Sequence, residues 1–312
     1  MKLAIFGTGG IAQKAYFPLL AVMPEVEIVG VHSRTQAHVD AACQRWGYTF
    51  GTTHMEEILS LKPKAALVIS STGSHYDICR ELLENGIDVY AEKSLTEYSK
   101  QSLQLAEIAQ ANKRILAVGF NRRYALLYKQ ARQILGDRKV DLAIVQKHRT
   151  EAYNSTLFKH YLDDSIHQID LMRFYCGDVV PATTTIEMKD GLMATAVSTV
   201  EIPGGGQGVI MICNQAGSWQ ESVTLHAQGI TIHVDAFQRL RIMSDDHEEV
   251  YGTDRAGKWI TGMKERGFYG EIAHFIDCVN TRQLPITTAI EAAKTQQLME
   301  SLIIASGETI DL

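Results

Sequence analysis

The chain has 312 residues, with 30 Lys and Arg against 36 Asp and Glu, and therefore a formal net charge of −6. A chain of this length is expected to form two domains with a sizeable core. Hydrophobic residues make up 46% and charged residues 21%, which is ordinary globular composition and excludes a predominantly disordered chain. The acidic balance argues against nucleic acid or an anionic membrane as the main partner.

Neither the apolar runs nor the cysteines indicate an exported or membrane-bound protein. No apolar run approaches the roughly 20 residues that cross a bilayer, and the start MKLAIFGTGG has too short an apolar stretch for a signal-peptide core. The cysteines are odd in number and stand singly, without a C-x-x-C pair. This pattern is typical of a reduced protein without a zinc site, so the sequence predicts a cytoplasmic protein that binds no metal.

The first 120 residues alternate short apolar runs with longer amphipathic stretches. The amphipathic stretches cover about residues 10–22, 35–46, 74–85 and 97–112. The apolar runs, which suit strands buried on both faces, are Lys2–Phe6, Glu27–His32, Ala65–Ser70, Asp88–Ala91 and Ile115–Gly119. This alternation predicts a doubly wound parallel sheet with helices on both faces, in a domain of residues 1–120.

After Gly119 the pattern changes to helical stretches mixed with two-residue alternation. The helical stretches are Tyr124–Leu135, Asp163–Tyr175, Gly270–Thr281 and Ala289–Ser306. The strand-like runs are Val140–His148, Thr183–Met188, Ala194–Ile202, Val209–Cys213, Ser222–Ala227, Thr231–Val234 and Arg239–Met243. Turn sequences such as Pro203–Gly206 join them. The sequence therefore predicts an α/β chain whose second domain, residues 121–312, is an α+β domain built on a largely antiparallel open sheet.

A glycine-rich loop directly follows the first strand and opens the first helix. Its residues, Gly7-Thr8-Gly9-Gly10-Ile11-Ala12, fit the G-x-G-x-x-A dinucleotide fingerprint. Gly7 permits a tight turn, Gly9 lets a pyrophosphate approach the main chain, and Ala12 allows close packing of helix on strand. Free N–H groups at the helix start would hold the phosphates. A glycine-rich turn without a ligand is the alternative, but the order strand, loop, helix favours a dinucleotide.

The residues about 20 positions past this loop bear on the choice between NAD and NADP. An NAD-binding domain usually has an acidic residue there, whereas this chain has Val31-His32-Ser33-Arg34. Ser33 can donate to a 2′-phosphate, and Arg34 can pair with it as a planar cation. In the alternative interpretation, Ser33 caps the next helix and Arg34 is solvated. The charge argument favours NADP, with NAD as the second choice.

Several motifs together resemble the Gfo/Idh/MocA family of nicotinamide-dependent oxidoreductases. They are the Gly7–Ala12 loop, Glu92-Lys93, Gly119–Tyr124 and Asp163-x-x-x-His167-x-x-Asp170. Three further segments resemble the MviM-like branch of this family: Lys147–Arg149, Leu162–Asp164 and Asn214–Ser218. The resemblance implies an N-terminal Rossmann domain and a C-terminal domain whose open sheet often mediates oligomers. A dimer or tetramer of identical chains is therefore expected.

The resemblance also implies a catalytic set. It places Lys93 beside the nicotinamide and substrate, although Ser94 stands where the family usually has proline. It places Asp163 and His167 on the substrate, and their spacing puts both on one stripe of a helix. Spacing alone favours structural roles, with Asp163 or Asp164 as a helix cap and His167 as a semi-buried histidine. With the resemblance, we expect His167 to be the general acid/base and Lys93 to orient the substrate oxygen. Asp163 would hold a substrate hydroxyl or orient the imidazole.

Weaker signals mark the remaining candidates. The loop with Ser71, Thr72 and His75 follows a strand where the crevice of such a sheet opens, and we expect it to touch the cofactor together with Glu92. Arg122 either holds substrate or makes a contact between domains, and Tyr161 is a further pocket residue. Asp170 is expected to support local structure. The basic segment Lys147–Arg149 is either a solvated strand edge or an anchor for an anionic substrate.

The sequence thus predicts a cytoplasmic NADP- or NAD-dependent oxidoreductase with a small-molecule substrate. The substrate class is a hydroxyl or carbonyl group of a sugar, a polyol or a related metabolite. A regulatory or interaction protein that binds the nucleotide without turnover is the main alternative, which Ser94 would permit. Hydride chemistry on a cyclic imine or a glycoside is a third.

Overall fold

The computed structural model describes residues 1–252 and 262–310, which fall into two compact units. The first unit comprises Met1–Phe120 together with Phe268–Ala293, and the second comprises Asn121–Gly267 and Lys294–Leu312. The sequence places a single division after residue 120. The return of residues 268–293 to the first unit is set by long-range packing, which local patterns do not reveal.

The first unit is built on a six-stranded parallel sheet with the strand order β3-β2-β1-β4-β5-β6. The strands are β1 (Lys2–Phe6), β2 (Glu27–His32), β3 (Gly51–Thr52), β4 (Ala65–Val68), β5 (Asp88–Glu92) and β6 (Leu116–Gly119). The predicted parallel sheet is confirmed, and only the two-residue β3 escapes the sequence pattern. The chain order reverses between β1 and β4, so a ligand crevice is expected at the carboxyl ends of these strands.

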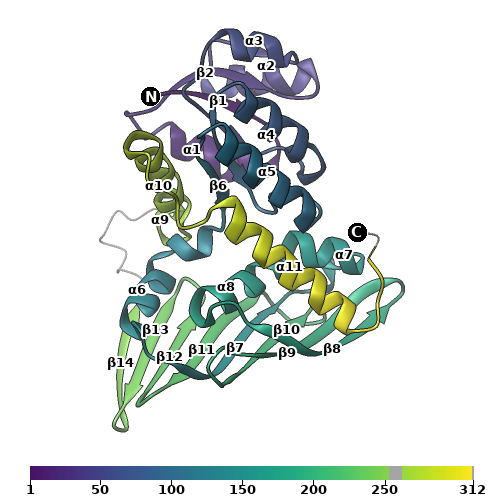
Figure 1. The fold of residues 1–312 in the computed structure, drawn as a ribbon, viewed down its shortest axis with the longest axis vertical. Helices are drawn as coiled ribbons and strands as arrows, with labels where there is room; N and C mark the ends of the chain where they lie inside the picture. The colour runs from purple at the N-terminus through teal and green to yellow at the C-terminus, as the bar shows by residue number, and fades with distance from the viewer. Residues whose placement is uncertain (253–261, 311–312) are drawn as a thin grey trace. The chain divides into compact units, whose positions relative to one another are not determined.

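Helices cover both faces of this sheet (Figure 1). They are a π-helical turn η1 (Ala12–Tyr16), α1 (Phe17–Leu20), α2 (Gln36–Trp46), α3 (Met55–Ser60), a short 3-10 turn η2 (Thr72–Ser74), α4 (His75–Glu84), α5 (Ser99–Ala111) and α10 (Phe268–Thr281). Aromatic contacts explain why α10 belongs here, since Phe268 packs on Tyr16 and Phe275 on Tyr90. The sequence missed α3 because it is short and buries only Ile58.

The second unit is built on an eight-stranded sheet with the order β14-β13-β12-β11-β7-β10-β9-β8. Its strands are β7 (Val140–His148), β8 (Val180–Lys189), β9 (Leu192–Glu201), β10 (Gln207–Cys213), β11 (Gln220–Ala227), β12 (Ile230–Asp235), β13 (Arg239–Ser244) and β14 (His247–Gly252). The predicted, largely antiparallel arrangement is confirmed, with β7 and β10 as a parallel pair. The missed strand, β14, is exposed at every position and has no buried face to mark it.

Alternation along β7 gives this sheet one covered and one open face. Ala143, Val145 and Lys147 are buried on the covered face, whereas Leu142 and Ile144 point to the other side. Helices α6 (Leu126–Leu135) and α8 (Ile166–Cys176) lie over the covered face (Figure 1). The smaller helical pieces are η3 (Asn121–Tyr124), η4 (Glu151–Tyr153), α7 (Leu157–His160), a π-helical turn η5 (Tyr161–Ser165) and α9 (Gly262–Glu265). The 17-residue helix α11 (Ala289–Ala305) begins in the first unit and ends in the second. In the described part of the chain, no helix is long and apolar enough to cross a membrane.

Candidate functional site

A cavity of about 660 Å³ lies at the carboxyl ends of β1, β2 and β4 in the first unit. Its wall is formed mainly by three loops, which are residues Gly7–Ile11, His32–Arg34 and Ile69–Ser71. The structure therefore brings together the glycine loop, Ser33, Arg34 and Ser71, all of which the sequence marks as cofactor contacts. Thr72, from the same set, begins the short turn η2.

The glycines of the loop serve two different purposes. Gly7 has a φ of +111°, and a Cβ placed on it would lie 2.5 Å from the backbone nitrogen of Ser70. Gly9 and Gly10 have open space instead, with no atom of the described residues within 4 Å of an added Cβ. Gly7 is thus required by the fold itself. The open space at Gly9 and Gly10 fits a pyrophosphate that must approach the main chain, so the loop fits a dinucleotide.

The end of the cavity near β2 is basic and rich in hydroxyl groups. The Thr8 hydroxyl lies 3.2 Å from the Ser33 hydroxyl and donates to it, and the side chain of Arg34 is exposed. Helix α2 begins at Gln36 after Thr35, so the alternative in which Ser33 caps this helix is wrong. Among the described residues that line the cavity, none is acidic. Burial lowers the pKa of the neighbouring His32, which leaves Arg34 as the permanent cation of this group.

The side chain of His75, which is expected to contact the cofactor, is held by two loops of the first unit. Its side chain is buried, and its ring nitrogens lie 3.1 Å from the carbonyl oxygens of Ser70 and Ser94. Burial, together with the nearby Lys93 ammonium, lowers the pKa of His75, so the neutral ring donates to one carbonyl at a time. His75 therefore links the loop after β4 to the loop after β5 and supports the cavity from inside the unit.

The side chain of Glu92 is also held inside the first unit. The Tyr16 hydroxyl lies 2.8 Å from both the Glu92 carboxylate and the Tyr90 hydroxyl, inside the core of the first unit. Glu92 thus faces the interior, although it was expected to contact the cofactor. The next residue, Lys93, is half-buried and joined to Ser94 by a cis peptide bond. Lys93 accordingly leaves the sheet at the carboxyl end of β5, on a loop whose Ser94 carbonyl faces His75.

In the second unit, the predicted helix from Asp163 begins as the π-helical turn η5 and continues as α8. Asp163 is exposed, whereas His167 is 7% exposed on the first turn of α8. Asp164 does not cap the helix, because it pairs with the Lys147 ammonium at 2.6 Å and with the Arg149 guanidinium at 2.6 Å. The π turn was not predicted, since a period longer than the α-helix has no clear signature over five residues.

Other expected substrate contacts are engaged inside the second unit. Arg122 donates to the buried Glu221 carboxylate at 3.1 and 2.9 Å. Its expected contact with a substrate stays a prediction. Arg123 pairs with Asp170 at 2.7 Å, which confirms that Asp170 supports local structure. Tyr161 is buried and hydrogen-bonded to Ser198, and burial raises its pKa to about 12.

The basic segment Lys147–Arg149 is also corrected. Lys147 and His148 end β7, which is central in the sheet, and Arg149 directly follows it, so the interpretation as a solvated edge is wrong. Lys147 is 1% exposed and faces the covered side together with Ala143 and Val145. A signal for this was present in the sequence, because Lys147 continues the inward-facing alternation of β7.

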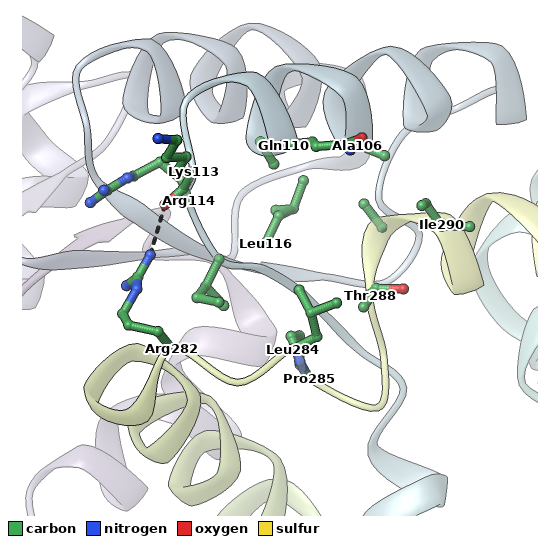
Figure 2. Close-up of a pocket in the computed structure, with 13 residues that line it drawn as sticks. Ala106, Gln110, Lys113, Arg114, Leu116, Arg282, Leu284, Pro285, Thr288 and Ile290 are labelled. Atoms are coloured by element: carbon green, nitrogen blue, oxygen red, sulfur yellow. Dashed lines mark hydrogen bonds between the residues drawn. The ribbon is translucent and has the colours of Figure 1, made fainter.

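A second cavity of about 470 Å³ lies in the first unit beside the start of β6 (Figure 2). Leu116, Leu284 and Ile290 line it, and Arg282 at one end donates to the backbone oxygen of Lys113. Its described lining contains no histidine or carboxylate and hence no group suited to proton transfer near neutral pH. The glycine-loop cavity is therefore the better candidate for a functional site.

Comparisons with known proteins agree with this assignment. Residues 1–120 match the family described as "Oxidoreductase family, NAD-binding Rossmann fold". The Salmonella typhimurium protein YceM, which is named as an oxidoreductase, is 29% identical to this chain over 97% of both chains. The scyllo-inositol 2-dehydrogenase (NAD(+)) of Bacillus subtilis is 22% identical over 94% of this chain and 90% of that protein. The crystal structure of a dehydrogenase (MviM) from Clostridium difficile has the same fold, with a TM-score of 0.89 and 24% identity over 97% of this chain and 99% of that one.

Proposed function

We propose that the chain is a member of the Gfo/Idh/MocA family and an NAD(P)-dependent dehydrogenase of a sugar, a polyol or a related metabolite, because residues 1–120 match the NAD-binding oxidoreductase family and YceM is similar over nearly the whole chain. The observation that carries the proposal is the glycine-loop cavity, whose open space at Gly9 and Gly10 fits a dinucleotide pyrophosphate. The inositol dehydrogenase among the relatives supports a polyhydroxylated substrate.

The proposed roles of the site residues follow from the chemistry of each side chain. The nicotinamide, when bound, supplies or accepts the hydride, so the chain must position the substrate and move a proton. His167 exchanges that proton with the substrate oxygen, because imidazole titrates nearest neutral pH. Lys93 stabilises negative charge on the same oxygen, and Asp163 holds a neighbouring hydroxyl or orients the imidazole. Lys93 comes from the first unit, and the two other residues come from the second.

Nicotinamide absorbance tests this function directly. The purified protein is incubated with NADP or NAD and a panel of inositols, sugars and sugar alcohols. We expect substrate-dependent reduction of the nucleotide with at least one polyol, and reduction slowed by about 10²–10⁴-fold in the His167→Ala variant. Binding of the nucleotide without turnover on any member of the panel, in either direction, would instead favour a regulatory protein.

Within this function, we propose that NADP binds more tightly than NAD. Arg34 is the cation at the end of the cavity where the 2′-phosphate would lie. Arg34→Ala should weaken NADP binding by about 1.5–3 kcal/mol, as for a lost charge-assisted hydrogen bond, and should leave NAD binding nearly unchanged. Calorimetric titration measures both affinities. Arg80→Ala is the matched control, because Arg80 is exposed on α4 and pairs with Asp77. An equal loss for both nucleotides would refute the 2′-phosphate assignment.

We further propose that the open face of the eight-stranded sheet joins identical chains into a dimer or tetramer. Leu142 and Val197 lie on this face and are 37% and 44% exposed. Val197→Glu should therefore shift the protein toward monomer in sedimentation analysis, while Glu84→Lys, at an exposed position of α4 in the first unit, should not. A wild-type protein that sediments as a monomer at micromolar concentration would rule out this assembly.

A further inference from the structure

Three segments far apart in the sequence meet at the π-helical turn η5 of the second unit. Lys147 comes from β7 and Arg149 directly follows that strand, Asp164 comes from the turn itself, and Asn214 directly follows β10. The Lys147 ammonium lies 2.6 Å from one Asp164 oxygen, while Arg149 contacts both oxygens at 2.6 and 3.1 Å. Two cations thus hold one carboxylate of the turn.

A second set of hydrogen bonds holds the end of the turn. The Asn214 amide donates to the Met193 carbonyl at 2.9 Å, so its oxygen is left to accept from His160 Nε2, also at 2.9 Å. His160 Nδ1 then accepts from the Ser165 hydroxyl at 2.9 Å. Burial lowers the pKa of His160, which keeps the imidazole neutral and suits this chain of donors and acceptors.

Three polar side chains of the turn are therefore held by partners outside it or at its end. Tyr161 bonds to Ser198, Asp164 to its two cations, and Ser165 to His160. Asp163 is the polar side chain of the turn that is exposed, and His167 follows on the next turn of helix. The fixed groups therefore determine the direction in which Asp163 projects and where α8 begins.

We propose that Lys147 is a positioning residue, which acts through Asp164 to hold the π turn so that Asp163 and His167 face the substrate. This inference rests on the proposed function for its catalytic consequence. Lys147 is suited to this role because it is buried on a central strand, where packing restricts the conformations of its side chain. The contacts of Lys147 and Arg149 with the Asp164 carboxylate form a clamp on the turn. Loss of the Lys147 charge removes one side of this clamp, and the turn then positions Asp163 less accurately.

The charged surroundings of Lys147 make this role dependent on pH. Its neighbours are Asp164, with Glu221 at 4.0 Å, and the cations Arg122 and Arg149; Tyr128 and His160 are the nearby titratable groups. Burial, reinforced by Arg122, lowers the pKa of Lys147 to about 8. Although burial opposes it, Lys147 and Arg149 hold the pKa of Asp164 well below its usual range. A rise in pH through about 8 therefore neutralises Lys147 while Asp164 stays charged, and the clamp weakens.

Steady-state kinetics as a function of pH test the inference once a polyol substrate is in hand. In the wild type, KM for the polyol should rise about 10-fold or more above pH 8, as for loss of a charge-assisted hydrogen bond, with a smaller change in kcat. Lys147→Arg keeps its charge, so its KM should stay low to higher pH. Lys147→Met should show the high KM already at neutral pH. The matched control Lys189→Met removes an exposed lysine of the same unit and should behave as wild type.

Amide hydrogen exchange separates this inference from the proposed function, because it needs no substrate. Exchange in residues 157–170, corrected for the intrinsic rate at each pH, should increase in Lys147→Met and in the wild type above pH 8, but not in Lys147→Arg. This pattern without turnover on any polyol would sustain the clamp and reject the dehydrogenase. The opposite result is turnover of a polyol in which neither KM nor the exchange rate changes on substitution of Lys147 or with pH. That result would overturn the clamp and leave the proposed dehydrogenase function in place. If Lys147→Met does not fold, the pH dependence of the wild type and of Lys147→Arg still decides.

Discussion

Replacing His167 by alanine is expected to lower kcat by about 10²–10⁴-fold, the usual contribution of a general acid or base. The imidazole is held on the first turn of α8, in the second unit, while the glycine-loop cavity belongs to the first. Nucleotide affinity should therefore stay close to wild type in calorimetric titration. Added imidazole should restore part of the turnover, because it replaces the missing proton carrier without repairing packing.

Lys93→Met should lower kcat by at least as much, since it removes a positive charge as well as a hydrogen-bond donor. Lys100→Met is the matched control, because Lys100 is an exposed lysine on α5 of the same unit. Near-wild-type kcat in a folded, nucleotide-bound Lys93 or His167 variant would reject the catalytic role of that residue.

Gly9→Val is expected to abolish detectable dinucleotide binding while leaving the fold intact. Gly9 has no left-handed φ, and an added Cβ has open space beyond its chain neighbours, so the fold should tolerate the substitution. It would instead occupy the space into which the pyrophosphate must come. The loss of binding thus comes from exclusion of the ligand and needs no strain in the loop.

Gly7→Val provides the contrasting variant for this prediction. Its Cβ would lie 2.5 Å from the Ser70 nitrogen, at a φ of +111°, so this protein should unfold at a markedly lower temperature. Thermal unfolding and calorimetric titration of both variants check the contrast. A stable Gly9→Val protein that binds nucleotide with unchanged affinity would remove the loop from the site.

The parts of the fold that the sequence predicts are those in which local pattern and burial coincide. β1, β2 and β7 begin and end where their apolar runs do. α3 and β14 escape because the first buries a single residue and the second buries none, so neither carries a periodic signal. The return of residues 268–293 to the first unit depends on aromatic contacts such as Phe275 with Tyr90, which join positions far apart in the chain.

In the candidate site, too, the sequence predicts what depends on local residue pattern and misses what depends on long-range contacts. The glycine loop and Arg34 could be recognised because their residue types and spacing reflect contact with a ligand. His75 and Glu92 lie beside such positions, but their side chains turn into the core, and the direction of a side chain at a loop boundary is set by its partners. The ion pair between Lys147 and Asp164 joins two segments through the tertiary fold, so spacing alone gives no hint of it.

Transfer of deuterium from a substrate carbon tests the central proposal most directly. A polyol that supports turnover is prepared with deuterium on its reacting carbon and incubated with the protein and oxidised nucleotide, and the reduced nucleotide is analysed by mass spectrometry and NMR. The account predicts that the deuterium appears at a single face of the nicotinamide ring, because hydride passes directly between bound partners. Reduced nucleotide without the label, or no reduced nucleotide with any polyol, would contradict it.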